Sequence, residues 1–512
     1  GVELAPGPKE LMNMQRFYLY LNMTKPGEKL ILSYSDTNAK GEGISPAYLI
    51  GSIRSLYPKL KIEGGAGVRP HKNSINNYCY PENPEAGIDL FLEKLVQETE
   101  KEHEDILEQA DETDAMFGEL YSWYLRNPEY RSRVQKLVQS AFAEKPEDII
   151  SQSVAKALYG EVSPYSATRL ERFAACAFAH FLQYGMKLTE RVEYEFKPMD
   201  MGNVMHEALE SFAEEVRKRG MKWTELTEQE RNEIADRCLD NIVADYGNTV
   251  LKSSARNEYM IERTRRILRR TVWALQKQLE QGEFQPEGFE VTFGGGRIDR
   301  VDIMEDQNKV YVKVIDYKTG NTSFDLVYLY HGLQLQLMIY LDGALRVEQK
   351  KYPDKEIIPA GVFYYNIKDP MIQEKIDADV EAVSAGLMKE LKMNGLVQAD
   401  PELVYRMDSS LGSIPVAFNK DGSFRKNSSV ADRTQFAVLG RYVRTKIEKI
   451  RSSILEGDAE VSPYELGKKN ACTYCPYMTV CGFDRRLSGY EFRRLKNFSD
   501  EELWKAFDRE AE

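Results

Sequence analysis

Residues 294–320, GGGRIDRVDIMEDQNKVYVKVIDYKTG, contain the clearest strand pattern in the chain. Two short runs rich in β-branched residues, 298–304 and 309–317, are separated by the four polar residues of 305–308. Two such runs joined by a short polar turn are typical of a β-hairpin. The sequence therefore predicts two antiparallel strands here, directly after a glycine-rich break at residues 294–296.

Amphipathic helices are expected on both sides of the hairpin. Ser166 is a suitable N-cap for a helix that reaches Tyr184, because apolar residues follow it at helical spacing. A strand over 361–366 is expected to extend the sheet. Further helices are expected over 201–218, 228–246, 257–281, 328–345 and 433–456, the last with Gly457 as its C-cap. Together these elements predict the α/β fold class.

Residues 1–160 form a second region with mixed patterns. A strand-like run occupies 29–34, and helical stretches are expected over 87–109 and 115–143. No G-x-x-x-x-G-K-[ST] phosphate loop occurs anywhere, so this sequence by itself lacks the usual ATP-binding loop. The chain begins with Gly1 in what reads as mid-domain sequence, and an upstream portion is expected to be missing.

Acidic and basic side chains gather on the predicted hairpin. Asp316 and Lys318 are two residues apart on one strand and so share a face, while the hairpin brings Asp299 alongside them. Two carboxylates that project together repel one another unless a cation lies between them, and oxygen ligands suit Mg²⁺ or Mn²⁺. The alternative is that the aspartates are turn residues beside a surface lysine. Asp302 is a weaker candidate because its strand position faces the other way.

Three further polar residues could complete this site. His206 lies on a predicted helix upstream, where its imidazole could bind the metal or a phosphate, although a lone helical histidine is usually structural. Gln336 and Tyr340 are one helical turn apart and share a face that could cover the site. They could equally be polar residues of the core.

Three of the six cysteines lie close together as C-T-Y-C-P-Y-M-T-V-C. Cys472, Cys475 and Cys481 need a fourth ligand to form a tetrathiolate site, and Cys176 is the best candidate because Cys79 and Cys238 lie in segments without a companion motif. Spacing alone leaves both Zn²⁺ and an iron–sulfur cluster open. A disulfide framework is not expected, since the cytoplasm is the default compartment and keeps thiols reduced.

Composition limits the partners. No run of about 18 apolar residues and no signal peptide is found, so neither a membrane nor export is expected. A net charge of -12 means that any DNA contact must be local. The best basic stretches, which could also be solvated helix faces, are Arg263 to Arg270 and Arg485 to Lys496.

Four motifs, in this order, resemble the RecB-type branch of the PD-(D/E)xK nucleases. They are G-x-x-x-H-x-x-L-E at 202–210, G-R-I-D at 296–299, I-D-Y-K at 315–318 and L-Q-L-x-x-Y at 335–340. The resemblance implies a restriction-endonuclease-like domain with helical surroundings that hydrolyses DNA phosphodiesters with a divalent metal. It also implies roles for six residues: metal ligands His206, Asp299 and Asp316, catalytic Lys318, and accessory Gln336 and Tyr340.

The cysteines resemble those of the B subunits of AddAB-type helicase-nucleases. One cysteine precedes the nuclease motifs and three follow, within C-x-x-C-P-Y and V-C-G-F-D. This resemblance implies that Cys176, Cys472, Cys475 and Cys481 hold a [4Fe-4S] cluster that staples the nuclease domain. The sequence departs from the family at Ala177, where the family often has proline.

The same family resemblance predicts the wider organisation. Residues 33–50 resemble the end of a helicase-like region, so we expect helicase-like sequence over 1–160, the nuclease domain over 161–490 and a helical tail over 491–512. The expected partners are single-stranded DNA from unwound duplex ends and an AddA-type helicase subunit, with cutting of the 5′-terminated strand during recombinational repair. The alternatives are a nuclease-inactive, cluster-stapled subunit that binds DNA or acts as a scaffold, and a zinc-bound scaffold unrelated to DNA.

Overall fold

The computed structural model falls into two compact units, residues 1–91 and 92–512. The domain boundaries expected near residues 160 and 490 stay predictions. The residues that the structure describes are 7–35, 44–60, 84–100, 112–142, 149–160, 166–189, 198–245, 254–294, 296–372, 379–485, 487 and 489–511.

The unit of residues 1–91 contains α1 (Pro8–Thr24), α2 (Tyr48–Leu56) and the start of α3 (Pro84–Glu100). No strand forms at 29–34, so the prediction of a strand there is wrong. A strand is stable when its backbone N–H and C=O groups pair with a neighbouring strand. Among the described residues, neither sheet includes this segment, which therefore stays without regular structure.

The helix expected over 115–143 is two helices, α4 (Glu112–Arg126) and α5 (Pro128–Ala141). The break falls at Asn127, whose side chain accepts a hydrogen bond from the Glu129 amide and so caps α5. Proline at the first helical position disfavours helical geometry in the residue before it, which ends α4. A third helix, α6 (Gln152–Tyr159), follows.

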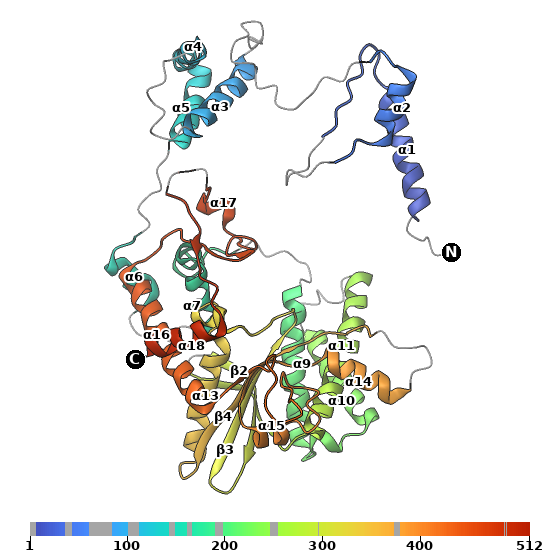
Figure 1. The fold of residues 1–512 in the computed structure, drawn as a ribbon, viewed down its shortest axis with the longest axis vertical. Coiled ribbons are helices and arrows are strands. Elements are labelled where there is room, and N and C mark those ends of the chain that lie inside the picture. The colour runs from blue at the N-terminus through green and yellow to red at the C-terminus, as the bar shows by residue number, and fades with distance from the viewer. Residues whose placement is uncertain are drawn as a thin grey trace. The chain divides into compact units, whose positions relative to one another are not determined.

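A six-stranded mixed sheet forms the centre of the unit of residues 92–512 (Figure 1). In spatial order the strands are β1 (Gln285–Phe293), β2 (Gly296–Glu305), β3 (Lys309–Lys318), β4 (Glu356–Asn366), β5 (Asn394–Gln398) and β6 (Val430–Ala431). The predicted hairpin is confirmed as β2–β3, with Arg300 opposite Ile315, and the strand expected at 361–366 is the second half of β4. Neighbouring strands are antiparallel except for β3–β4 and β5–β6.

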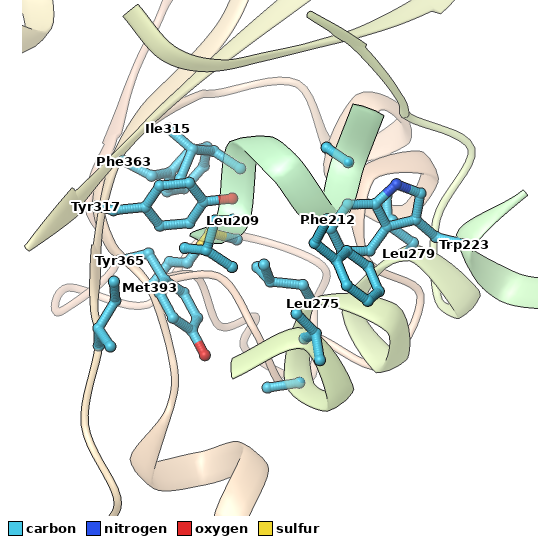
Figure 2. Close-up of a cluster of buried hydrophobic side chains, with 14 of the residues drawn as sticks. Leu209, Phe212, Trp223, Leu275, Leu279, Ile315, Tyr317, Phe363, Tyr365 and Met393 are labelled. Carbon is cyan, nitrogen blue, oxygen red and sulfur yellow. The ribbon is translucent and has the colours of Figure 1, made fainter. Parts of the chain in front are cut away.

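Helices cover both faces of this sheet, which confirms the α/β fold class (Figure 1). On one side lie α9 (Pro198–Lys218), α10 (Glu228–Asp245) and α11 (Ala255–Glu280). Figure 2 shows the apolar cluster on this side, where Leu209 of α9 and Leu275 of α11 lie near the strand residues Ile315 and Phe363. Full burial of each such side chain stabilises the fold by roughly 1.5–3 kcal/mol.

The other face of the sheet packs against a second apolar cluster. Val312 and Val314 of β3 belong to it, whereas Tyr311, Ile315 and Tyr317 belong to the first cluster, as the alternation of a strand requires. The helices that contribute to the second cluster include α7 (Ala167–Ala175), α12 (Leu326–Tyr330), α13 (Gln336–Lys351), α16 (Arg433–Glu456) and α18 (Asp500–Ala511). Gly457 ends α16 with φ of 96°, which confirms it as the C-cap.

Two predicted helices are interrupted. Ser166 caps α7 as predicted, but Cys176 is extended and ends that helix, and α8 (Ala177–His180) begins after it. The helix expected over 328–345 is divided into α12 and α13 at Gly332, whose φ of 79° favours glycine. Both interruptions turn out to lie beside candidate site residues.

The remaining α-helices and strands lie after β4. A small sheet, in the order β8 (Lys469–Asn470), β7 (Tyr464–Leu466) and β9 (Arg493–Arg494), lies in the segment that carries the three clustered cysteines. No described helix is long and apolar enough to cross a membrane. These elements are α14 (Val380–Glu390), α15 (Pro401–Met407), β7 (Tyr464–Leu466), β8 (Lys469–Asn470), α17 (Met478–Cys481) and β9 (Arg493–Arg494).

Candidate active site

The hairpin β2–β3 brings the predicted acidic residues together. Because Arg300 lies opposite Ile315, Asp299 and Asp316 are the next residues along the two strands and share the face that α13 covers. The Asp299 carboxylate accepts a hydrogen bond from the Tyr317 amide at 2.7 Å. Both aspartate side chains are almost fully buried, although they lie where the paired part of the hairpin ends.

Lys318 is held by three neighbours. Its Nζ lies 2.7 Å from Asp316 Oδ2 and donates to Gln336 Oε1 at 2.8 Å. It also lies 5.5 Å from the centre of the Tyr364 ring, on the neighbouring strand β4. A cation over an aromatic face is attracted to it, so Tyr364 helps to keep the ammonium inside the site.

Gln336, the first residue of α13, links the parts of this network. Its Nε2 donates to Asp316 Oδ1 at 2.8 Å and to the Tyr340 hydroxyl at 3.0 Å. Gln336 and Tyr340 therefore share one helix face toward the acidic residues, as their spacing predicted. Their proposed roles as accessory catalytic residues stay predictions.

His206 approaches Asp299 from α9. Its Nδ1 lies 3.4 Å from Asp299 Oδ2, and its Nε2 lies 3.1 Å from the Tyr317 carbonyl oxygen. Burial acts to lower the pKa of His206, but the nearby carboxylates of Glu290 and Asp299 outweigh it and raise the pKa. This histidine is therefore part of the polar site and not an isolated core residue.

Glu290 is a site residue that the sequence patterns did not reveal. It lies on β1, with φ of 49°, and its side chain forms an ion pair with Arg297. Potential metal-binding atoms of His206, Glu290 and Asp299 all lie within 4.8 Å of one another. Asp316 is not in that group, because its carboxylate faces Lys318 and Gln336 instead. The assignment of Asp316 as a metal ligand stays a prediction.

The electrostatics of the site favour a bound cation. Burial, and then the charge of Asp316, raise the pKa of Asp299 to about 7. Burial also raises the pKa of Asp316, against the opposing effect of Lys318. A divalent cation would offset the repulsion and the burial of these carboxylates, and carboxylate oxygens with one imidazole nitrogen suit Mg²⁺ or Mn²⁺. The donor set thus fits a divalent metal.

The four predicted cysteines line one pocket. Cys176, at the end of α7, shares this pocket with Cys472, Cys475 and Cys481. Burial and then the neighbouring Cys176 raise the pKa of Cys472 to about 12, so this thiol favours the neutral form unless a metal centre binds it. Within the described part of the chain, no three thiol sulfurs lie within 4.8 Å of one another.

Cys238 does not line this pocket. Cys238 of α10 is buried in the apolar cluster on the opposite side of the sheet. Cys79 lies outside the described residues.

The basic stretch of α11 is largely neutralised. Arg265 pairs with Asp240, Arg266 with Asp369 and Arg269 with Asp236. Paired arginines offer less charge to phosphates than free ones. This arrangement favours the interpretation of a solvated helix face over that of a DNA contact.

Comparison with known proteins agrees with this geometry. Residues 164–482 match the model of the PD-(D/E)XK nuclease superfamily, which covers all the predicted site residues. The chain therefore belongs to the PD-(D/E)XK nuclease superfamily.

Within that class, the whole chain is similar to bacterial proteins that are named as the B subunit of an ATP-dependent helicase/deoxyribonuclease. It is 39% identical to the protein of Lachnoclostridium phytofermentans and 31% identical to those of Alkaliphilus metalliredigens and Clostridium acetobutylicum. All of this chain is covered, but only 44% to 45% of each relative. The chain thus spans less than half the length of these curated relatives.

Proposed function

We propose that this chain carries a metal-dependent deoxyribonuclease that acts as part of a helicase-nuclease complex. The observation that supports this most directly is the convergence of Asp299, Asp316, Lys318 and Gln336 from three separate segments on one polar site. A structural role alone does not require two buried carboxylates with raised pKa values beside a lysine.

In this proposal, His206, Asp299 and Asp316 hold Mg²⁺ or Mn²⁺, and Glu290 is an added candidate ligand. The metal, when bound, lowers the pKa of a bound water and stabilises charge on the scissile phosphate. The Lys318 ammonium, held between Asp316 and Gln336, orients the attacking water and offsets the charge that develops on the phosphate. Gln336 and Tyr340 fix the position of Lys318 and Asp316.

The proposal is tested by metal dependence. The chain is expected to degrade labelled single-stranded DNA with Mg²⁺ or Mn²⁺ and to lose this activity completely in excess EDTA, with recovery when Mg²⁺ is restored. Gel analysis of the cleaved DNA measures the result. Undiminished cutting in EDTA would contradict the metal dependence, whereas no cutting with either metal would favour the alternative of an inactive DNA-binding or scaffolding protein.

The wider role is proposed from the relatives. Their name describes one part of an ATP-dependent helicase/deoxyribonuclease, which supports a complex in which an AddA-type helicase subunit unwinds a DNA end and this chain receives single-stranded DNA. We propose that it cuts the 5′-terminated strand, and that the complex processes broken ends for recombinational repair.

We further propose that the cysteine pocket holds a [4Fe-4S] cluster. The family resemblance favours a [4Fe-4S] cluster over a single Zn²⁺ in the pocket that the four cysteines line. Such a centre would join Cys176 to a segment almost 300 residues later and stabilise the domain between them.

Cys475→Ser is expected to release iron and destabilise the fold. Anaerobically purified wild-type chain should contain about four iron atoms and four sulfides, whereas the variant should contain little of either and unfold at lower temperature. Cys238→Ala is the matched control. Because Cys238 lies away from the pocket, this variant should contain as much iron as the wild type. Zinc without iron in the wild-type protein would overturn the cluster assignment.

A further inference from the structure

Glu171 is a charged residue beside the candidate active site that no motif includes. It lies in the middle of α7, on the helix that ends at Cys176. Burial raises the pKa of Glu171 to about 7, and both Lys318 and Asp316 lie close enough to influence it. Keeping a carboxylate in such a position costs free energy, so its contacts are informative.

The Glu171 carboxylate caps a helix other than its own. Its Oε1 accepts hydrogen bonds from the backbone amides of Leu335 at 2.7 Å and Gln336 at 2.9 Å. These amides belong to the start of α13, where Leu335 is the N-cap residue and makes no side-chain cap of its own. The first amides of a helix have no hydrogen-bond partner within it. Glu171 therefore supplies the acceptor that the apolar side chain of Leu335 cannot provide.

The capped residue is the one that organises the site. The amide of Gln336 is held by Glu171, while its side chain contacts Lys318, Asp316 and Tyr340. Removing the cap would allow the first turn of α13 to shift or fray, and the Gln336 side chain would move with it. A misplacement of about 1 Å in a catalytic site can lower the rate about a hundredfold.

The helix that carries Glu171 is packed into the apolar core. Leu170, Phe173 and Ala174 of α7 are buried in the same apolar cluster as Leu337 of α13. Arg493 of β9 also donates a hydrogen bond to the Ala174 carbonyl oxygen, close to the end of α7. The carboxylate is therefore presented to α13 from a fixed helix and not from a mobile loop.

We infer that Glu171 is a positioning residue of the hydrolytic site, which fixes the first turn of α13 so that Gln336 holds Lys318 and Asp316 in place. This inference rests on the proposed nuclease function. Glu171 acts through Gln336 and does not touch the substrate or the metal.

The test compares Glu171→Ala with Glu171→Gln in single-stranded DNA cleavage. The alanine variant is expected to lose about a hundredfold in kcat with less than a threefold change in KM. Glutamine keeps an oxygen acceptor at the same reach, so its kcat should recover to within about fivefold of the wild type. Glu230→Ala is the matched control, because Glu230 caps α10 on the opposite side of the sheet.

A double-variant cycle separates positioning through Gln336 from a general loss of stability. If Glu171 acts through Gln336, adding Glu171→Ala to Gln336→Ala should lower kcat little further, whereas independent effects would multiply. Multiplying effects would overturn the inference, as would a kcat of Glu171→Ala within threefold of the wild type.

If the alanine variant does not fold, the kcat of Glu171→Asp is compared with that of the wild type instead. This variant keeps the charge but withdraws the acceptor by one methylene, so a loss of at least tenfold in kcat is expected, and an unchanged kcat would overturn the inference. An inactive wild-type chain would instead count against the proposed nuclease function itself.

Discussion

Asp316→Asn is expected to reduce Mg²⁺-dependent cleavage of single-stranded DNA by about a thousandfold or more. Asparagine keeps the size of the side chain but removes the charge that pairs with Lys318 and is proposed to bind the metal. Losing a single preorganised charge contact at the reacting phosphate costs roughly 3–4 kcal/mol of transition-state stabilisation, and loss of a metal ligand adds to this. Initial rates of product formation measure the effect.

The same variant should not be less stable than the wild type by more than about 1 kcal/mol. Burial raises the pKa of Asp316 against the opposing effect of Lys318, so ionising this carboxyl is less favourable in the folded chain than in water. The neutral amide removes that cost, so activity and stability should separate. A variant that loses its activity only because it unfolds would contradict the catalytic assignment.

Asp306→Asn is the matched control for Asp316→Asn. The same substitution is made on the same hairpin, but Asp306 lies in the exposed turn, where it pairs with Arg406. Exposed ion pairs contribute roughly 0–1 kcal/mol, so both activity and stability should stay near the wild-type values. Full activity in the Asp316 variant, or an equal loss in both variants, would remove Asp316 from the catalytic site.

The second large effect is expected at Asp302, where Asp302→Asn should lower the free energy of unfolding by about 3–5 kcal/mol. Asp302 is fully buried and pairs with Arg300 at 2.6 Å and Lys313 at 2.9 Å. Burial alone would raise the pKa of Asp302, but the two cations hold it below its usual range. Removing the carboxylate leaves two buried cations without their partner.

Urea unfolding followed by tryptophan fluorescence measures this cost. The Trp223 ring lies beside the Arg300 guanidinium, so its emission should report on this part of the fold. Adding Lys313→Met to Asp302→Asn should recover part of the loss, because one unpaired cation is replaced by an apolar side chain. Stability of the single variant within about 1 kcal/mol of the wild type would show that the buried charges are not coupled in this way.

Much of the site could be predicted because its residues follow regular spacing. Asp316 and Lys318 are separated by the period of a strand, and Gln336 and Tyr340 by one turn of a helix, so the sequence alone placed each pair on one face. The predicted hairpin then brought Asp299 alongside Asp316 and Lys318. Cys176 does line one pocket with the three clustered cysteines, and its role as their fourth ligand stays a prediction.

Glu290 and Glu171 escaped prediction for different physical reasons. Glu290 lies on an edge strand whose charged and glycine-containing sequence gives a weak strand pattern, and its left-handed backbone breaks the alternation. The partners of Glu171 are backbone amides 164 and 165 residues away. Backbone groups are the same in every residue, so no side-chain motif could mark them.

The packing of α18 has a consequence for synthesis of the protein on the ribosome. Leu503 and Phe507 of this helix complete the apolar cluster that supports α13, and the same cluster contains residues of α7 and α16. While translation proceeds from α13 to α18, the nascent chain has every motif of the proposed site but lacks Leu503 and Phe507 in the cluster behind it. A polypeptide that ends before α18 should therefore be cut by proteases more readily than the full chain.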